Sequence, residues 1–471
     1  MTCERPALST LARLGACILL FVSAACTKAA DDAPGPPNIL MIVVDDLGWN
    51  DVGYHNPEVL TPTLDRLAAA GVRLDRHYVY PVCSPTRAAL LTGRSALGMG
   101  IDGPMSDDAG LPLEVPLLPE RLKEAGYQTY LIGKWHLGLH DTRYFPQARG
   151  FDYFYGHLGG FIEYYSHLYY DGLDWQRNGT SLEEQGHATE LMAADAVRVL
   201  EARDRSRPFF MLLSLNAPHT PVQPPTGLDH MYSDLEDPLR ADYLRLVFAM
   251  DAAIGRVIAA LEEDGALDDT LVVFFSDNGG NAREGGADNR PLRGEKGDAF
   301  EGGLRVPAFV TWASQLTGGR AYDAPVTVHD WWPTVLSLAG LEGDGIGIDQ
   351  WPALTGEASV GPREFALGSR RAMAYYSWPW KLIVTGAMQE ARLFNMEDDP
   401  YEARDLAAAR PDIAASLSKK LAGLPRGPSL ADTNPPPENL WRDEDGGLDY
   451  DKRRDLPATA PPWAEQAAGA P

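Results

Sequence analysis

The stretch "NILMIVVDDLGWND", residues 38–51, contains the pattern that decides the fold. After Asn38 the next six residues are all apolar, which is typical of a strand buried on both faces of a sheet. Asp45 and Asp46 follow where this strand ends. Ligands of open α/β sheets bind at the carboxyl ends of the strands. The stretch therefore predicts a central strand that delivers two acidic side chains to a binding site.

Four later runs share the apolar character of residues 38–44. They are "QTYLIG" (128–133), "PFFMLLSL" (208–215), "TLVVFFS" (270–276) and "RVPAFVTW" (305–312). Segments with helical spacing or helical start and stop signals separate the runs, at 61–71, 115–126, 242–265 and 326–340. This alternation predicts an α/β fold with a large, mostly parallel sheet flanked by helices.

The sequence changes character after Gly340. A loop-rich stretch is followed by a predicted hairpin at 372–386, a strand and turn at 391–407, and a closing helix at 411–424. We interpret this part as a small C-terminal α+β domain. Proline, glycine and charged residues dominate residues 425–471, which predicts a weakly ordered tail.

The N-terminus has the pattern of an export signal. Arg5 and Arg13 precede an apolar run at residues 14–25, which is too short to span a bilayer. Cys26 follows small residues and resembles a bacterial lipobox, in which the cysteine is lipidated; ordinary cleavage near residues 29–30 is the alternative.

We therefore expect a signal peptide over 1–26, of the lipoprotein type, and a tether over 27–37. The predicted location is the periplasm or outer membrane of a bacterium. A lipid anchor would be the protein's contact with the membrane.

The charge balance restricts the partners. The chain of 471 residues has 41 lysines and arginines against 66 acidic residues, a formal net charge of −25. Such a charge opposes nonspecific binding to nucleic acids. It also repels anionic substrates, unless the active site forms a local island of positive charge.

Cys83 is unusual because the other three cysteines lie within the first 26 residues. Without them no internal disulfide can form, so Cys83 is an inert thiol, a metal ligand or a reactive group. The helical stretch that follows it has a possible cap at Ser84, Pro85 in the first turn and a stop at Gly93.

These signals place Cys83 just ahead of a helix N-terminus. The helix dipole and free N–H groups favour an anion there, and Arg87 lies one turn further along the same face. We therefore expect an exposed anion site with a sulfur at its lip, which argues against the inert thiol.

A second acidic pair supports a metal site. Asp277 and Asn278 follow the buried run 270–276, as Asp45 and Asp46 follow the first. Such residues often only form turns, but two such pairs after similar strands favour a shared ligand. Three carboxylates and an amide suit Ca²⁺ or Mg²⁺ better than zinc.

Several motifs carry a family resemblance. The segment "CSPTR" (83–87), followed by "AALLTGR" (88–94), resembles the formylglycine signature of the type I sulfatases, Cys-X-Pro-X-Arg. Further motifs agree in the same order: "GKWHLG" (133–138), "APHTP" (217–221) and "PLRGEKGDAFEGGLRVP" (291–307). The resemblance extends from residue 38 to about 421. Residues 149–167 and 277–296 are most similar to the arylsulfatase B group, which includes N-acetylgalactosamine-4-sulfatases.

The resemblance implies an alkaline-phosphatase-like sandwich with a large mixed sheet. The catalytic sulfatase domain would span 38–343 and the small C-terminal subdomain 344–424. A maturation enzyme would oxidise Cys83 to formylglycine, an aldehyde. One hydroxyl of its hydrate would attack sulfur and expel the alcohol, and the second would then release sulfate.

The resemblance also implies roles for individual residues. The metal would be held by Asp45, Asp46, Cys83 in its modified form, Asp277 and Asn278. The catalytic group would comprise Cys83, Arg87, Lys134, His136, His219 and Lys296. Arg87 and His136 would hold the formylglycine hydrate, and Lys134 would contact the sulfate. His219 and Lys296 would grip the sulfate, one of them acting as general acid.

These inferences predict an exported sulfatase that hydrolyses sulfate monoesters of carbohydrates and uses Ca²⁺, with Mg²⁺ also compatible. One alternative is a phosphate or phosphonate monoester hydrolase of the same superfamily, and another is a non-catalytic glycan-binding lipoprotein. Four residues suit a sugar pocket, core packing or a role as surface aromatics: Tyr164, Tyr165, His167 and Trp175.

Overall fold

The computed structural model describes residues 35–386 and 390–430. The predicted signal peptide, most of the predicted tether and residues 431–471 of the predicted tail lie outside the described residues. The chain divides into two units, Met1–Pro36 and Pro37–Pro471, and all elements below belong to the second. None of the helices within the described ranges is long and apolar enough to cross a membrane.

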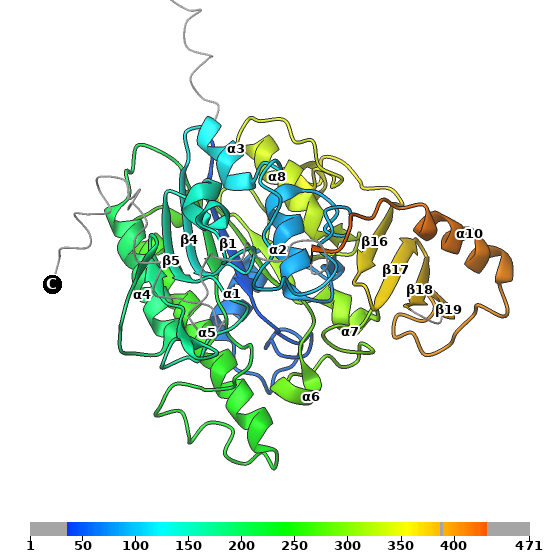
Figure 1. The fold of residues 1–471 in the computed structure, drawn as a ribbon, viewed down its shortest axis with the longest axis horizontal. Coiled ribbons are helices and arrows are strands. Elements are labelled where there is room, and N and C mark those ends of the chain that lie inside the picture. Colours follow the sequence, from blue (N-terminus) through cyan, green and yellow to red (C-terminus); the bar gives the residue numbers. More distant parts are fainter. Residues whose placement is uncertain (1–34, 387–389, 431–471) are drawn as a thin grey trace, which may run out of the picture. The chain divides into compact units, whose positions relative to one another are not determined.

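A ten-stranded mixed sheet forms the centre of this unit (Figure 1). In spatial order its strands are β14 (Arg320–Tyr322), β2 (Val72–Leu74), β13 (Ala308–Thr311), β11 (Thr270–Ser276), β1 (Asn38–Val44), β10 (Phe209–Ser214), β4 (Gln128–Lys134), β5 (Tyr153–His157), β8 (Gln176–Arg177) and β9 (Thr180–Ser181). The five strands from β11 to β5 run parallel to one another, and the pairings of β11 with β13 and of β5 with β8 are antiparallel. The predicted α/β class is confirmed.

Helices cover this sheet. They are α1 (Pro62–Ala70), α2 (Cys83–Thr92), α3 (Leu118–Glu124), α4 (Ala188–Ala202), α5 (Pro238–Glu263), α6 (Ala282–Gly285), α7 (Glu301–Leu304), α8 (Trp331–Leu338) and α9 (Trp351–Thr355). The helices α4 and α5 pack against each other, and α8 packs against α2 and α3. Figure 1 shows these two groups on different sides of the central strands. Short 3-10 helices occur at 142–144, 146–149, 267–269 and 328–330.

Two smaller sheets accompany the ten-stranded sheet. One contains β12 (Arg305–Val306), β3 (His77–Tyr78) and β15 (Val326–Thr327), and the other contains β6 (Leu168–Tyr169) and β7 (Gly172–Leu173). The run 305–312, predicted as one strand, is divided between β12 and β13 in two different sheets. Pro307 separates them, because proline has no N–H to donate to a ladder.

The C-terminal part contains a four-stranded antiparallel sheet and a helix. Its strands are β16 (Glu364–Gly368), β17 (Ala372–Ser377), β18 (Trp380–Thr385) and β19 (Glu390–Asn395), followed by α10 (Pro411–Ala422). The predicted hairpin, strand and closing helix are therefore confirmed. Figure 1 shows α10 beside this sheet.

A buried ion cluster joins the C-terminal sheet to α7. Lys381 of β18 pairs with Glu301 of α7, with 2.9 Å between Nζ and Oε1, and with Oε1 of Glu402 at 2.6 Å. All three side chains are fully buried. The hydroxyl of Tyr376 also donates to Glu301, over 2.7 Å. Because a buried charge is costly unless it is paired, this cluster fixes β18 against the start of α7.

The cluster predicts a pH-dependent stability. Burial, reinforced by the charge of Glu301, raises the pKa of Glu402 from 4.5 to about 7, although Lys381 opposes the shift. Between these two values the folded chain holds a proton that the unfolded chain lacks. Raising the pH through this window should therefore lower the free energy of unfolding. In Glu402→Gln this decrease should be smaller.

The measurement is urea unfolding at about pH 5 and about pH 8. Glu397→Gln is the matched control, because it removes an exposed carboxylate that, like Glu402, follows β19. Its pH dependence should follow that of the wild type. A Glu402→Gln chain with the wild-type pH dependence would contradict the protonated state of Glu402.

Candidate active site

The parallel strands bring the predicted site residues to one edge of the sheet. Asp45 follows β1, Asp277 follows β11 and Lys134 ends β4. The N–H of Asp277 donates to the carbonyl of Val44 over 2.9 Å, so the strand pairing continues to the site itself. The edge that the sequence predicted for ligand binding is therefore where these side chains gather.

The acidic residues form a buried set of oxygen donors. Asp45, Asp277 and Asn278 are fully buried, and Asp46 is 2% exposed. Within residues 35–386 and 390–430, the Oδ1 atoms of Asp45, Asp277 and Asn278 have no hydrogen-bond partner. Buried polar atoms normally have one, and unpartnered hard oxygens are the ligands that Ca²⁺ and Mg²⁺ prefer. The donor set therefore fits a divalent cation.

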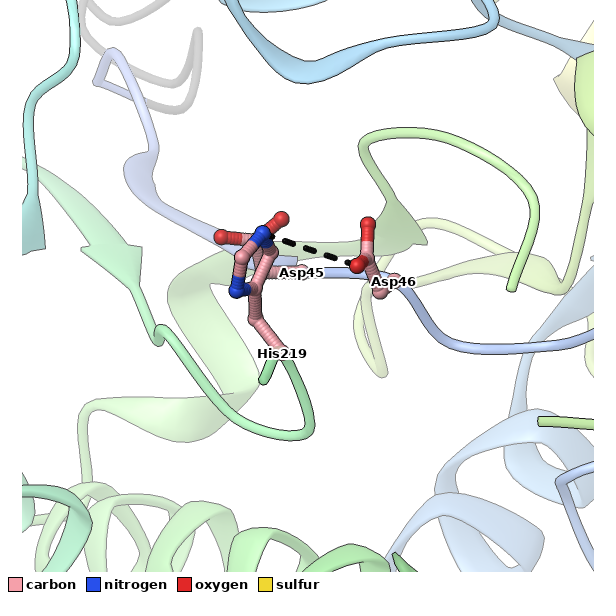
Figure 2. A group of neighbouring side chains, drawn as sticks. All are labelled: Asp45, Asp46 and His219. Atoms are coloured by element: carbon pink, nitrogen blue, oxygen red, sulfur yellow. Dashed lines mark ion pairs between the residues drawn. The ribbon is translucent and has the colours of Figure 1, made fainter. Parts of the chain in front are cut away.

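His219 lies beside this set (Figure 2). Ligand atoms of Asp45, Asp46 and His219 lie within 4.8 Å of one another. However, Nδ1 of His219 is 2.6 Å from the carbonyl oxygen of Thr220, and Nε2 is 3.0 Å from Nζ of Lys296. Because both ring nitrogens already have partners, the oxygen donors are the better candidate ligands.

Each buried carboxylate is paired with a cation. Nζ of Lys134 lies 2.5 Å from Oδ2 of Asp45, and Nζ of Lys296 lies 2.7 Å from Oδ2 of Asp46. The Arg87 guanidinium donates through Nε to Oδ2 of Asp277 over 2.9 Å. The cations that an anionic substrate requires are therefore present, but each of them is balanced by a carboxylate of the set.

Electrostatics separate Asp45 from Asp277. Burial raises the pKa of Asp45, but the charges of Lys134, His219 and Arg87 together hold it well below its usual value. Burial and the charge of Asp45 raise the pKa of Asp277 well above its usual value, with Arg87 opposing. Without a bound metal ion, Asp45 therefore ionises much more readily than Asp277.

Cys83 is the first residue of α2, and its environment differs from the prediction. The N-cap is Val82 rather than Ser84, whose Oγ accepts a hydrogen bond from the N–H of Met105 over 2.9 Å. Cys83 is 3% exposed, so the expected exposed lip is wrong. The helix begins two residues earlier than predicted, at Cys83 rather than Pro85, and the Ser84 hydroxyl, inside the first turn, binds a later loop. Gly93 ends the helix in the left-handed conformation, as predicted.

His136 lies against the Cys83 thiol. Its Nδ1 is 3.1 Å from the sulfur. Gly160 packs against the imidazole ring, and a Cβ at this position would lie 2.7 Å from Cε1 of the ring. A larger residue at position 160 would therefore displace the ring. Burial lowers the pKa of His136 well below its usual value, and the charges of Lys134 and Arg87 lower it further. The imidazole is therefore neutral and is held in one place.

His219 and Lys296 form a second polar pair. Burial, with the Lys296 charge, lowers the pKa of His219 to about 4, although Asp46 opposes it. Burial opposes the ammonium of Lys296, but the charges of Asp46, Cys83 and Asp45 raise its pKa above its usual value. Lys296 therefore holds the proton and His219 accepts it as a hydrogen bond. The hydroxyl of Tyr164 donates to the His219 carbonyl over 2.9 Å and so positions this loop.

Ser214 is a site residue that the sequence analysis missed. Its Oγ lies 2.5 Å from Nη1 of Arg87 and donates to the carbonyl of Lys134 over 2.7 Å. A polar residue near the carboxyl end of the apolar run 208–215 was a signal that could have identified it.

The four aromatic residues left open between sugar pocket and core are also placed. Tyr164, His167 and Trp175 are buried, and Tyr165 is 43% exposed. The first three therefore belong to the core, where Tyr164 supports the loop of His219.

Comparison with known proteins identifies the family. The family model described as Sulfatase matches residues 37–341. The chain belongs to the sulfatase family. It is 31% identical to Arylsulfatase J of Mus musculus, over 84% of this chain and 77% of that protein. It is 35% identical to N-acetylgalactosamine-6-sulfatase of Homo sapiens, over 66% of this chain and 64% of that protein.

Solved structures agree with this family. The crystal structure of Ps i-CgsB superimposes with a TM-score of 0.79 and 31% identity, over 84% of this sulfatase and 94% of that chain. The predicted alkaline-phosphatase-like fold and the predicted sulfuric ester hydrolase are confirmed, so a non-catalytic binding protein is not favoured. The arylsulfatase B subgroup and the domain boundaries stay predictions.

The pairing of Arg87 predicts a stability effect. Replacing Arg87 with Gln leaves buried Asp277 without its cation and should lower the free energy of unfolding by about 3–5 kcal/mol. Arg94→Gln, at the end of the same motif, is the matched control. Arg94 pairs with Asp344 where both side chains are exposed, so its loss should cost less than about 1 kcal/mol. Urea unfolding measures both, and equal small losses would contradict the pairing.

Proposed function

We propose that this sulfatase hydrolyses sulfate esters of carbohydrates with a formylglycine made from Cys83 and a divalent metal, Ca²⁺ or Mg²⁺. The observation that carries the proposal is the placement of Cys83. Cys83 lies at the N-terminus of α2, and its sulfur contacts His136. A negative charge on Cys83 would interact with Arg87, Lys296 and Asp277.

The aldehyde supplies a hydrate with two hydroxyl groups, one to attack sulfur and one to release the sulfate afterwards. The surrounding side chains prepare its place. The neutral ring of His136 can accept a proton from a hydroxyl at the position of the Cys83 sulfur, 3.1 Å from Nδ1. Arg87 is fixed by Asp277, Ser214 and the Lys134 carbonyl, so its charge is aimed before any substrate arrives.

The metal would be held by Asp45, Asp46, Asp277 and Asn278. The unpartnered oxygens of three of these residues support the assignment. A divalent cation there supplies Lewis acidity and offsets the negative charge of the sulfate. It would also remove the conflict between Asp45 and Asp277, whose mutual repulsion raises the pKa of Asp277.

Two cationic side chains, Lys134 and Lys296, and the neutral ring of His219 would bind the sulfate group and the leaving oxygen. When carboxylate oxygens turn to a metal, Lys134 and Lys296 become available to the substrate, because each is paired with one of those carboxylates. Lys296 carries a proton and contacts Nε2 of His219. Between them these two groups can deliver a proton to the departing alcohol.

A carbohydrate substrate is supported by the relatives. Human N-acetylgalactosamine-6-sulfatase is 35% identical over 66% of this chain. The structure of Ps i-CgsB in complex with k-i-k-neocarrahexaose superimposes with a TM-score of 0.78 and 30% identity. Phosphonate Monoester Hydrolase of Agrobacterium radiobacter, at 19% identity and a TM-score of 0.63, shares the fold, so phosphate and phosphonate esters remain the comparison substrates.

The proposal also includes maturation and export. A formylglycine-generating enzyme would recognise the segment around Cys83 before or during folding, because the folded thiol is buried. The apolar leader and Cys26 support export to the periplasm or outer membrane as a lipoprotein.

Metal binding has a readout that is independent of activity. Adding Ca²⁺ or Mg²⁺ to the chelator-treated protein should raise its unfolding temperature, by the equivalent of about 2.7 kcal/mol at 100 times the dissociation constant. Asn278→Ala should weaken this response, because it removes one unpartnered oxygen. Asp344→Asn, an exposed acid away from the donor set, should retain it. No stabilisation at millimolar cation would refute the metal site.

The reaction is tested with matured and unmatured protein. Chain produced with a maturation enzyme should carry an aldehyde at position 83 by mass spectrometry and release sulfate from sulfated sugars. Chain of the same sequence produced without that enzyme is the matched control. The Cys83→Ala variant should lose at least about 10⁴-fold in kcat.

A panel of sulfated mono- and disaccharides, with nitrophenyl sulfate and nitrophenyl phosphate, separates the reaction classes. Full activity of a chain that retains its thiol would refute the formylglycine mechanism. Faster phosphate than sulfate hydrolysis across the panel would favour the phosphoesterase.

A further inference from the structure

The cavity above the sulfate-binding residues is larger than a sulfate group needs. It has a volume of about 460 Å³ and is lined by His219 and Lys296. This volume is in the range of pockets for whole small molecules. The cavity extends to three other segments, at 102–104, 281–284 and 369–371. It therefore has room for more of a substrate than its sulfate group.

Two arginines of the C-terminal sheet stand in this cavity. Arg370 and Arg371 lie in the connection between β16 and β17 and are exposed. Among the described residues neither guanidinium has an ion-pair partner. Arg283 in the same cavity differs, since it pairs with Glu295 over 2.6 Å. Arg370 and Arg371 are thus the uncommitted positive charges of this wall.

The backbone holds both arginines in place. The N–H of Arg370 donates to the carbonyl of Asp102 over 2.9 Å, and the carbonyl of Arg371 accepts from the N–H of Gly386 over 2.7 Å. The N–H of Arg371 donates to Oγ of Ser369. A Cβ at Gly103 would lie 4.0 Å from Nε of Arg370. The connection is therefore anchored to the opposite wall of the cavity as well as to its own sheet.

Two uncommitted charges are significant in a chain with a net charge of −25. A polyanionic glycan would be repelled by such a surface unless its charges met local cations. Lys134 and Lys296 can bind only the reacting sulfate, because both lie beside the buried carboxylates. Guanidinium groups bind planar or tetrahedral anions through two parallel hydrogen bonds.

Among the described residues, none of the acidic side chains of the cavity forms an ion pair with Arg370 or Arg371. Glu295 is paired with Arg283 and also accepts the N–H groups of Ala282 and Arg283. Asp102 accepts a hydrogen bond from Ser429 over 3.0 Å, and Glu284 is exposed. Carboxylates in these positions can accept hydrogen bonds from sugar hydroxyls.

We propose that Arg370 and Arg371 form a specificity subsite for a second anionic group, a carboxylate or a further sulfate ester, on the sugar next to the one that loses its sulfate. This inference rests on the proposed sulfatase activity toward carbohydrates. It assigns to the enzyme a glycan with charges on adjacent sugars, rather than one with isolated sulfates.

The test compares three disaccharide probes. Sulfated N-acetylgalactosamine, or the sulfated sugar that the panel identifies, is linked to glucose, to glucuronic acid or to glucose 6-sulfate. In the matured wild type, kcat/KM for at least one charged probe should exceed that for the glucose probe by about ten- to hundredfold. The double variant Arg370→Gln, Arg371→Gln should reduce this ratio toward one, mainly through KM.

Two further variants separate the subsite from general charge effects. The double lysine variant, Arg370→Lys with Arg371→Lys, should keep an intermediate ratio, because lysine retains the charge but not the fork. Arg404→Gln, an exposed arginine outside the cavity in the same C-terminal part, should keep the wild-type ratio. A response to glucuronic acid alone, to glucose 6-sulfate alone or to both identifies the anion and supports the subsite in each case.

A wild-type ratio near one, or a ratio that survives in the double glutamine variant, would overturn the subsite while leaving the sulfatase proposal intact. Absence of sulfate release from every probe, with the aldehyde verified, would instead count against the proposed function. In that case calorimetric binding of the same probes to the Cys83→Ala chain decides the subsite, through the same ratio of affinities with and without the two arginines.

Discussion

Three buried carboxylates at one edge of a sheet are the constraint on which the rest of the structure depends. Asp45, Asp46 and Asp277 lie where water is excluded, and like charges in such surroundings repel one another strongly. The chain compensates with Lys134, Arg87 and Lys296. These cations come from β4, from α2 and from the loop before α7. Neutralising the acids therefore requires the sheet, a helix and a distant loop to be assembled together.

The central strands could be predicted because a strand that is buried on both faces is a continuous run of apolar residues. Strand β11 matches the predicted run 270–276 residue for residue. The prediction failed at 305–312, where apolar composition does not show which sheet a segment joins. It also overlooked α4 (Ala188–Ala202), whose cap positions, His187 and Arg203, provide neither a capping side chain nor a terminal glycine. Packing against α5, rather than local signals, accounts for that helix.

The site was largely predictable, because its residues follow strand ends or stand in ordered motifs. What the sequence could not provide were contacts between distant segments. Ser84 turned out to bind the backbone of Met105 instead of capping its own helix. The exposure expected for Cys83 was wrong for a related reason, since Cys83 is buried and its sulfur contacts His136, 53 residues further along the chain. Arg370 and Arg371 lie more than 280 residues beyond Cys83, and nothing local marks them as neighbours of the active site.

The C-terminal sheet separates anchoring from recognition along its own strands. Lys381 in β18 fixes the sheet to α7 through buried charges, whereas the connection between β16 and β17 presents only three residues, 369–371, to the cavity. The strand pairing continues to the ends of that connection. The pairing of β16 with β17 reaches Gly368 opposite Met373, and the pairing of β17 with β18 reaches Ala372. Under the proposed subsite, replacing this three-residue turn on the same ladder would change the preference for the neighbouring sugar, while the residues of the candidate active site would stay as they are.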